Sequence, residues 1–267
     1  MPKIFDCFTF FDENFLVNSR FEILNDVVDY FVIVESTFDH QGKKKDINFK
    51  LQNYKYKNKV RHIIHDSKNL SSIKGWEAEK LQREKLFEGI KDAKDDDIIL
   101  FSDSDEIPNP ELLKNIFLNK KYAIFLQKFF VYKLNVYNEH ESPWEGTRAC
   151  LKKNLKSFYF LRKKIVKKNL VKPFWKFHLE KNIQIIGNGG WHFNNLYSVE
   201  NISKKLKAAP HQEFSSDKFS SEKAIKDNIS KLQDLYGRNH KYKKVPIDDS
   251  YPKFFQENSD KFKDYIL

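Results

Sequence analysis

In Asp97-Ile98-Ile99-Leu100-Phe101-Ser102-Asp103-Ser104-Asp105-Glu106-Ile107-Pro108, a short apolar run ends in three carboxylates within four residues. An apolar run of this length, which begins after Asp97 and is followed by Pro108, indicates a buried strand. The carboxylates stand at its C-terminal end, where open α/β sheets bind ligands. Because three close negative charges repel one another unless a cation lies among them, the stretch predicts an Asp-x-Asp site. Asp103 and Asp105 would hold Mn²⁺ or Mg²⁺, which accept oxygen ligands, and through it a nucleotide diphosphate.

A second interpretation of the same stretch is structural. Asn109 is a good N-cap residue, and Pro110 fits the first position of a helix. Residues 103–106, the acidic turn, would then only start a helix over residues 110–118. Both interpretations can hold together, since capping requires only Asn109.

The order of elements along the chain predicts parallel βαβ units. Apolar runs at residues 3–11, 27–35 and 60–65 are typical of strands, and residues 12–25 of a loop and helix. We expect an α/β fold. Because the chain shows no internal repeat and no flexible linker, we expect a single domain over residues 1–267.

The rest of the chain divides into further expected elements. Spacing and composition predict helices at 76–90, 199–208, 221–235 and 252–266, and strands within 122–137 and at 157–161, 176–179 and 183–187. On the helix at 76–90, Arg83 would reach either the acidic turn or a bound phosphate, or would form an ordinary buried ion pair.

The formal charge of +11 is concentrated in one segment. Residues 152–181, the basic segment, carry eleven Lys or Arg residues and one acid, Glu180, with interleaved aromatic residues. Such a segment suits nucleic acid, an anionic membrane surface or an acidic glycan, and it equally suits a solvated lysine-rich face. An aromatic content of 15% excludes a disordered chain.

Two distant cysteines, Cys7 and Cys150, lack metal-ligand spacing, and we expect buried free thiols in a reducing compartment. The N-terminus has no signal-peptide pattern, and no apolar run reaches membrane-spanning length. These features predict a cytoplasmic protein, with peripheral membrane contact allowed.

Gly187-Asn188-Gly189-Gly190-Trp191-His192-Phe193 places a histidine after a glycine-rich turn. Two interpretations of His192 stay open: a hydrogen-bonded core histidine, or a third metal ligand that reaches back to Asp103 or Asp105. Trp191 could stack on a sugar or a base.

Two glutamates are candidates for a general base. Glu213 follows His211 in His211-Gln212-Glu213-Phe214, which otherwise fits a surface turn. Glu145, in Pro143-Trp144-Glu145-Gly146, is the alternative base and lies beside a tryptophan that could stack on a sugar ring.

Taken in order, these motifs resemble glycosyltransferase family 17. The resemblance rests on Cys7-Phe8-Thr9-Phe10-Phe11-Asp12-Glu13, Val32-Ile33-Val34-Glu35-Ser36, Gly75-Trp76 with Gln82-Arg83, Phe101 to Pro108, Gly190-Trp191-His192, Lys205-Leu206 with His211-Gln212-Glu213-Phe214, and Tyr251-Pro252-Lys253-Phe254-Phe255. It spans nearly the whole chain.

The resemblance implies a GT-A-like fold, with a nucleotide-sugar half over about residues 1–125 and an acceptor half over about 126–267. It implies a UDP-sugar donor, UDP-GlcNAc by preference, and inversion at the anomeric carbon. Asp103, Asp105 and His192 would hold the metal, which stabilises charge on the leaving phosphate. Our candidate for the base is Glu213, a residue that the resemblance places without assigning its role. The residues expected at the donor are Phe8, Glu35, Arg83, Asp103, Ser104, Trp191 and His211.

The chain departs from the eukaryotic members of that family. It shows no N-terminal membrane anchor, and Phe193 and Asn194 stand where those members have cysteines. We therefore expect a cytoplasmic enzyme acting on a surface or lipid-linked glycan, with the basic segment against anionic lipid. The competing hypotheses are a metal-dependent nuclease or phosphotransferase, and a non-catalytic module that binds nucleic acid or membrane.

Overall fold

The computed structural model describes residues 2–66, 70–208 and 211–267. Its strands are β1 (Ile4–Phe10), β2 (Tyr30–Ser36), β3 (Val60–His65), β4 (Ile98–Asp103), β5 (Glu106–Pro108), β6 (Tyr122–Val131), β7 (Val136–Tyr137), β8 (Trp144–Leu151), β9 (Ile183–Ile186), β10 (Gly190–Asn194) and β11 (Lys243–Lys244). Its α-helices are α1 (Asn14–Leu24), α2 (Gly75–Glu84), α3 (Pro110–Leu113), α4 (Phe158–Lys163), α5 (Val199–Ala208), α6 (Asp217–Ser220), α7 (Glu222–Ser230) and α8 (Lys253–Glu257). The 3₁₀ segments are η1 (Tyr54–Tyr56), η2 (Leu70–Ser72), η3 (Lys85–Ile90), η4 (Lys152–Asn154), η5 (Lys167–Val171), η6 (Gln212–Phe214) and η7 (Ser259–Tyr265).

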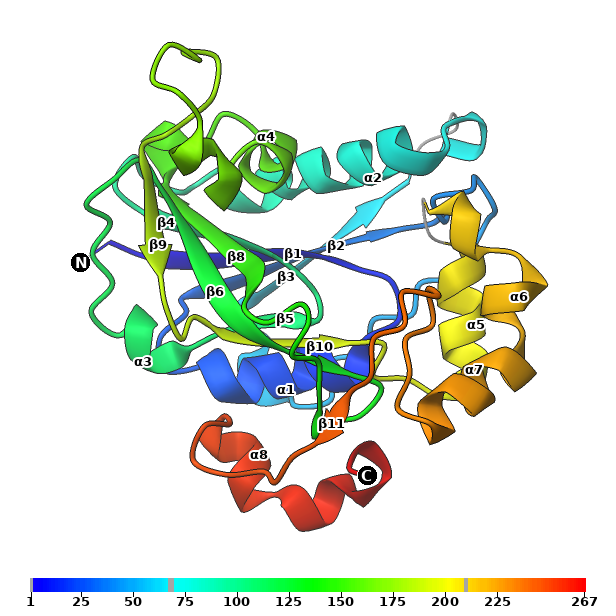
Figure 1. Ribbon diagram of the computed structural model, residues 1–267. Coiled ribbons are helices and arrows are strands. Elements are labelled where there is room, and N and C mark those ends of the chain that lie inside the picture. The colour runs from blue at the N-terminus through cyan, green and yellow to red at the C-terminus, as the bar shows by residue number, and fades with distance from the viewer. Residues whose placement is uncertain (1, 67–69, 209–210) are drawn as a thin grey trace.

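The strands form one mixed sheet in the order β11-β7-β6-β8-β4-β1-β2-β3 (Figure 1). β4, β1, β2 and β3 are parallel neighbours, which confirms the expected βαβ arrangement. β8 is antiparallel to β4 and to β6, and β10 runs parallel to β6 and antiparallel to β5. The α/β class is thus confirmed, with a parallel half and a mixed half.

Strand register brings the predicted site residues to one edge of the sheet. Thr9 in β1 pairs with Asp103 in β4, and Phe10 pairs with Glu35 in β2. All these residues stand at the carboxyl ends of parallel strands, where this class of sheet binds ligands. The acidic turn begins at Asp103, the last residue of β4, and leads into β5.

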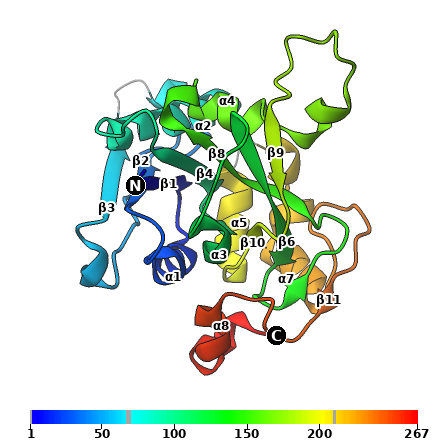
Figure 2. The same cartoon turned by 90° about the vertical axis from the view of Figure 1, so that its left-hand side faces the viewer.

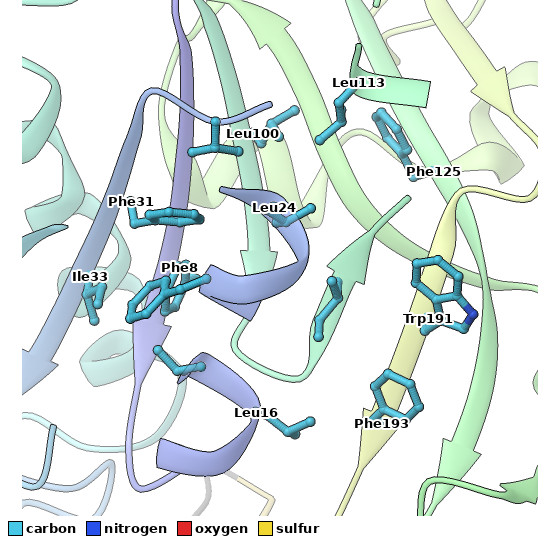
Figure 3. Close-up of a cluster of buried hydrophobic side chains, with 14 of the residues drawn as sticks. Phe8, Leu16, Leu24, Phe31, Ile33, Leu100, Leu113, Phe125, Trp191 and Phe193 are labelled. Carbon is cyan, nitrogen blue, oxygen red and sulfur yellow. The ribbon is translucent and has the colours of Figure 1, made fainter. Parts of the chain in front are cut away.

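Helices cover both faces of the sheet (Figures 1 and 2). On one face α1 and α8 pack over a cluster that includes Phe8, Leu16 and Phe31, seen in Figure 3. On the other face α2, η3 and α4 cover a second cluster, which contains Phe101 and Phe158. No helix in the described ranges is both long enough and apolar enough to span a membrane.

Several expected helices are shorter than the sequence suggested. The helix expected over 76–90 is α-helical only to Glu84 and continues as 3₁₀ helix, and that over 110–118 ends at Leu113. The Asn109 side chain does accept from the Glu111 amide, so the predicted cap is confirmed. The helix expected over 221–235 ends at Ser230, two residues before Leu232 takes a positive φ of 51°.

Two expected strands in the basic segment are wrong. Residues 158–161 lie in α4, and Ser157 caps this helix by accepting from the Phe160 amide. Residues 176–179 lie in turns. Aromatic residues favour strands in general, but here Phe158 is buried in the second cluster from a helix. Tertiary packing has overridden the local preference.

The glycine-rich turn before His192 is a close approach between backbones. Gly190 has a φ of 131°, and a Cβ atom at this position would lie 2.1 Å from the Ile107 carbonyl oxygen. Only glycine fits here, because an L side chain is strained at this φ and would also collide with β5. The turn therefore sets β10 beside β5, with His192 opposite Glu106.

Candidate active site

A cavity of about 470 Å³ opens at the carboxyl edge of the parallel strands. Residues from β1, α2, the acidic turn, β10 and α5 line it, and these elements converge at the right of Figure 1. Asp103, Ser104, Asp105 and His192 lie on the same wall. This location agrees with the one that the sequence predicts for the Asp-x-Asp site.

Two arginines hold Asp103. Arg162 Nη2 lies 2.5 Å from one carboxylate oxygen, and Arg83 Nη2 lies 3.3 Å from the other. Burial raises the pKa of Asp103 and the nearby Asp105 charge also raises it, but the two guanidinium groups outweigh them and leave the pKa below its ordinary value. The carboxylate is therefore ionised and fixed in direction.

Arg162 joins the Asp103 and Glu106 carboxylates. Its Nη2 also lies 2.7 Å from Glu106 Oε1, and Glu106 is fully buried. The Trp144 indole donates to the same Glu106 oxygen at 2.7 Å. Burial lowers the pKa of Arg162, but Asp103 and Glu106 raise it above the ordinary value. The arginine is thus a buried positioning residue behind the cavity wall.

Arg20 fixes the acidic turn from the α1 side of the sheet. Its fully buried guanidinium pairs with Asp6 in β1 at 2.6 Å, and donates to the Ser102 hydroxyl and to the Glu106 carbonyl. A buried charge requires such a set of partners. β1, β4 and the turn are held in one position as a result.

Asp105 has a different set of partners. His192 Nε2 lies 3.3 Å from Asp105 Oδ1, and Lys205 Nζ from α5 lies 3.5 Å from Oδ2. Burial raises the pKa of Asp105, yet His192 and Lys205 together hold it well below the ordinary value. Lys205 also lies 3.7 Å from Glu13, so it connects the α5 side of the cavity to the β1–α1 loop.

The donor chemistry of Asp105 and His192 suits a divalent metal, since a carboxylate oxygen and an imidazole nitrogen face each other at the cavity. The Nδ1 atom of His192 is buried without a hydrogen-bond partner in the described part of the chain. Asp103 differs, because both of its oxygens are engaged by arginines. No cluster of three or more His, Cys, Asp or Glu residues among residues 2–66, 70–208 and 211–267 is arranged to hold a metal. Asp105 and His192 are the pair that fits one, with the remaining ligands left to substrate and water.

The structure brings four of the seven expected donor residues to the cavity. Arg83, Asp103, Ser104 and His211 line it. The other three lie elsewhere. Phe8 is fully buried in the core under Arg20, whose guanidinium carbon is 4.7 Å from the ring centroid. Contact between Phe8 and a ligand in the cavity is blocked by this packing, so its role is structural.

Glu35 and Trp191 also have structural roles. The buried Glu35 carboxylate accepts from Lys45 and from the amides of Asn48 and Phe49, and so anchors the segment after β2. Trp191 packs in the core and donates from its indole to the Ser250 carbonyl at 2.9 Å. Neither residue lines the cavity. Lys45, which Glu35 holds, does line it.

The two candidate bases lie outside the cavity lining. Glu213 is exposed and its carboxylate lies 2.8 Å from His211 Nδ1, while the His211 ring meets Trp76 edge-on. Glu145 accepts from the Lys167 amide and pairs with Arg148. Glu213 precedes Phe214, which lines the cavity. Glu145 is held instead by the Lys167 amide and Arg148.

Sequence reasoning missed several groups at the site. In the sequence Arg162 is one of many cations of the basic segment. In the structure it lies in α4, which packs against α2, and its side chain is directed to the acidic turn. Phe129 stacks on the His192 ring at 4.3 Å. Arg238, paired with Asp234 and Glu141, lines the far end of the cavity. No local motif marks any of these residues.

Residues 1–263 match the sequence model of glycosyltransferase family 17. The chain belongs to this family. It is a glycosyltransferase with an α/β fold, and the family implies a nucleotide-sugar donor and a glycan acceptor. A comparison with curated proteins gave no match.

The comparison with solved structures gave matches of low sequence identity. One is glucosyl-3-phosphoglycerate synthase from Mycobacterium tuberculosis in complex with Mg²⁺ and UDP, at 12% identity and a TM-score of 0.38, covering 96% of this chain and 92% of that one. A mycobacterial protein is similar at 12% identity and a TM-score of 0.40, covering 94% and 87%. A 4-diphosphocytidyl-2C-methyl-D-erythritol synthase is similar at 13% identity and a TM-score of 0.38, covering 70% and 89%.

Proposed function

We propose that this family 17 member is an inverting, metal-dependent N-acetylglucosaminyltransferase, which moves GlcNAc from UDP-GlcNAc to a surface or lipid-linked glycan. The observation that carries the proposal is the cavity wall at the carboxyl edge of the parallel strands. There Asp103 and Asp105 face the cavity together with His192. The cytoplasmic location expected from the sequence stays a prediction.

Cationic side chains would hold the diphosphate. Lys45, Arg83, Lys205 and Arg238 all line the cavity. Arginine offers a planar fork that suits phosphate oxygens, and lysine offers a compact charge. Of these, Lys205 lies beside Asp105, so it is the group best placed to contact the phosphate that departs.

The metal would be held by Asp105 and His192, and when bound it would supply Lewis-acid stabilisation of the charge on the leaving diphosphate. Asp103, kept ionised by its two arginines, would accept hydrogen bonds from the donor. Arg162 would act through Asp103 rather than on the substrate, because it lies behind the wall.

In the transfer step an acceptor hydroxyl oxygen forms a bond to the anomeric carbon. The bond from that carbon to the diphosphate oxygen breaks, and its electron pair leaves with UDP. The hydroxyl proton passes to Glu213, which His211 orients through the 2.8 Å contact. Attack from the face opposite the leaving group inverts the anomeric centre.

The experiment is release of the nucleoside diphosphate, which is UDP from UDP-GlcNAc, UDP-Glc and UDP-Gal and GDP from GDP-Man, with Mn²⁺, with Mg²⁺ and with a chelator. We expect turnover with UDP-GlcNAc and a metal ion. Glu213→Gln should keep donor affinity and lose turnover by about 10²-fold or more, as expected for a general base. Glu145→Gln is the matched variant and should turn over normally. Turnover that is fastest with another donor, or unaffected by chelation, would refute the corresponding part of the proposal.

A further inference from the structure

A loop in the basic segment exposes an unusual set of apolar side chains. The exposed fractions are 82% for Val171, 77% for Phe174, 62% for Trp175 and 84% for Phe177. Residues 171–179, the aromatic loop, project beyond the rest of the ribbon in both views (Figures 1 and 2). Large apolar side chains gathered at one exposed site usually mark a binding surface.

The aromatic loop is held in its shape by its own hydrogen bonds. Asn169 Nδ2 donates to the carbonyls of Lys164 and Glu180 at 2.8 and 3.1 Å, which closes the base of the loop. Lys181 Nζ donates to the Pro173 carbonyl, and the Lys176 amide donates to the same oxygen. These hydrogen bonds therefore fix the backbone of the loop, while its apolar side chains stay exposed to solvent.

The charge around the tip is positive. Five lysines flank it at positions 167, 168, 172, 176 and 181, and Glu180 is the single acid between Lys167 and Lys181. Within the described residues none of these five lysines forms an ion pair with a carboxylate. Their charges are free to meet an anionic partner.

We propose that the aromatic loop docks on an anionic lipid bilayer, with Phe174, Trp175 and Phe177 in the interfacial region and the lysines against the headgroups. Tryptophan favours the membrane–water interface, and lysine reaches headgroup charges from an apolar base. Each lysine near an anionic surface adds to the affinity. This inference goes beyond the transferase chemistry and does not depend on it.

A single-stranded nucleic acid is disfavoured as the partner. Stacking on bases uses the flat faces of rings in a basic groove. Here the most exposed side chains include Val171, which has no ring, and the exposed aromatic residues lie on a loop. Phe174 and Trp175 contact each other edge-to-face at 80°, which leaves an apolar wedge rather than parallel platforms.

The test is sedimentation of the full chain with vesicles of phosphatidylcholine alone or mixed with phosphatidylglycerol. We expect binding to the anionic vesicles only, weaker at high salt, with a blue shift of tryptophan emission that Trp175→Phe removes. The combined variant Phe174→Ser/Trp175→Ser/Phe177→Ser should lose at least tenfold in affinity. Lys172→Ser/Lys176→Ser should lose about fivefold for each charge removed.

Matched controls lie on other parts of the surface. Phe117 is as exposed as Phe174, at 77%, so Phe117→Ser removes an exposed ring elsewhere. Lys223→Ser/Lys226→Ser removes two exposed charges from α7. Both should bind vesicles as the wild type does. The proposal is overturned if wild type ignores anionic vesicles, if the loop variants bind as tightly as the controls, or if a single-stranded RNA oligonucleotide displaces the protein from them by competing for the loop.

Discussion

Arg162 in α4 and Asp103 at the end of β4 form an ion pair across 59 residues of sequence, with Nη2 2.5 Å from Oδ2. The same guanidinium contacts the buried Glu106. α4 thus determines the direction of the first carboxylate of the acidic turn from behind the cavity wall. Arg162 is the residue of the basic segment that pairs with these carboxylates, and seven of the segment's ten lysines are exposed.

Removal of Arg162 should destabilise the protein. Arg162→Ala leaves Glu106 charged and fully buried without its arginine, and breaking a buried pair in this way costs about 3–5 kcal/mol. Urea unfolding followed by circular dichroism measures the loss. Lys153→Ala, which breaks the exposed pair with Asp96, is the control and should unfold like wild type. Equal midpoints for wild type and Arg162→Ala would refute the structural role given to this residue.

The turn before His192 should not tolerate a side chain at Gly190. Gly190→Ala combines an unfavourable φ with a collision against the Ile107 carbonyl, and we expect a loss of about 3 kcal/mol or more. Gly187→Ala is the matched control in the same turn, because a Cβ there meets no atom within 4 Å. Thermal unfolding of the two variants compares them. A Gly190→Ala protein as stable as Gly187→Ala would contradict the described contact.

Glu35 should make stability depend on pH. Burial raises the pKa of Glu35, but hydrogen bonds from His62, the Asn48 amide and Lys45 outweigh it and lower the folded-state pKa. A lowered folded-state pKa gives stability that is present above the unfolded value of about 4.5 and is lost as pH falls through the folded value.

Glu35→Gln should therefore lose about 2 kcal/mol or more of unfolding free energy at neutral pH, since it gives up charge-assisted hydrogen bonds. The difference in unfolding free energy between Glu35→Gln and wild type should become smaller as the pH falls below about 4. Urea unfolding across this range measures both effects. The exposed Glu257→Gln serves as the reference and should follow wild type throughout. If this difference in unfolding free energy stays constant or grows in acid, protonation of Glu35 does not contribute to the pH dependence of stability.

The two thiols should be unreactive in the native protein. Cys7 and Cys150 are free and buried. Burial raises the pKa of both thiols, that of Cys150 to about 12, so little thiolate forms at neutral pH. An aromatic disulfide reagent should modify both only after unfolding in urea. Fast modification of the native chain would contradict the burial of these residues.

Much of the parallel half was predictable because its signals are local. The strands at Ile4–Phe10 and Tyr30–Ser36 are mainly apolar or β-branched, and Asn109 is a cap residue placed before a proline. The acidic turn was recognisable because its carboxylates follow such a strand directly. In these cases one short window of sequence determines the structure.

The remaining features depend on contacts between distant segments. Residues 157–161 look like a strand by composition, yet Ser157 caps a helix whose Phe158 fills the core. Arg162 and Arg20 contact the acidic turn across 59 and 86 residues of sequence. Phe8 and Trp191 belong to family motifs, and the fold uses both in the core. A motif identifies which positions matter, but the packing decides whether a side chain faces ligand or core.

Calorimetric titration of UDP-GlcNAc into wild type and into Asp105→Asn, each with and without Mn²⁺, measures whether this cavity binds the donor through a metal at Asp105. We expect binding by wild type that requires Mn²⁺ and is lost in Asp105→Asn. Asp96→Asn, which alters an exposed carboxylate, should behave like wild type. Equal binding by wild type and Asp105→Asn, or no binding of UDP-GlcNAc by folded wild-type protein with Mn²⁺, would contradict the donor site described for this cavity.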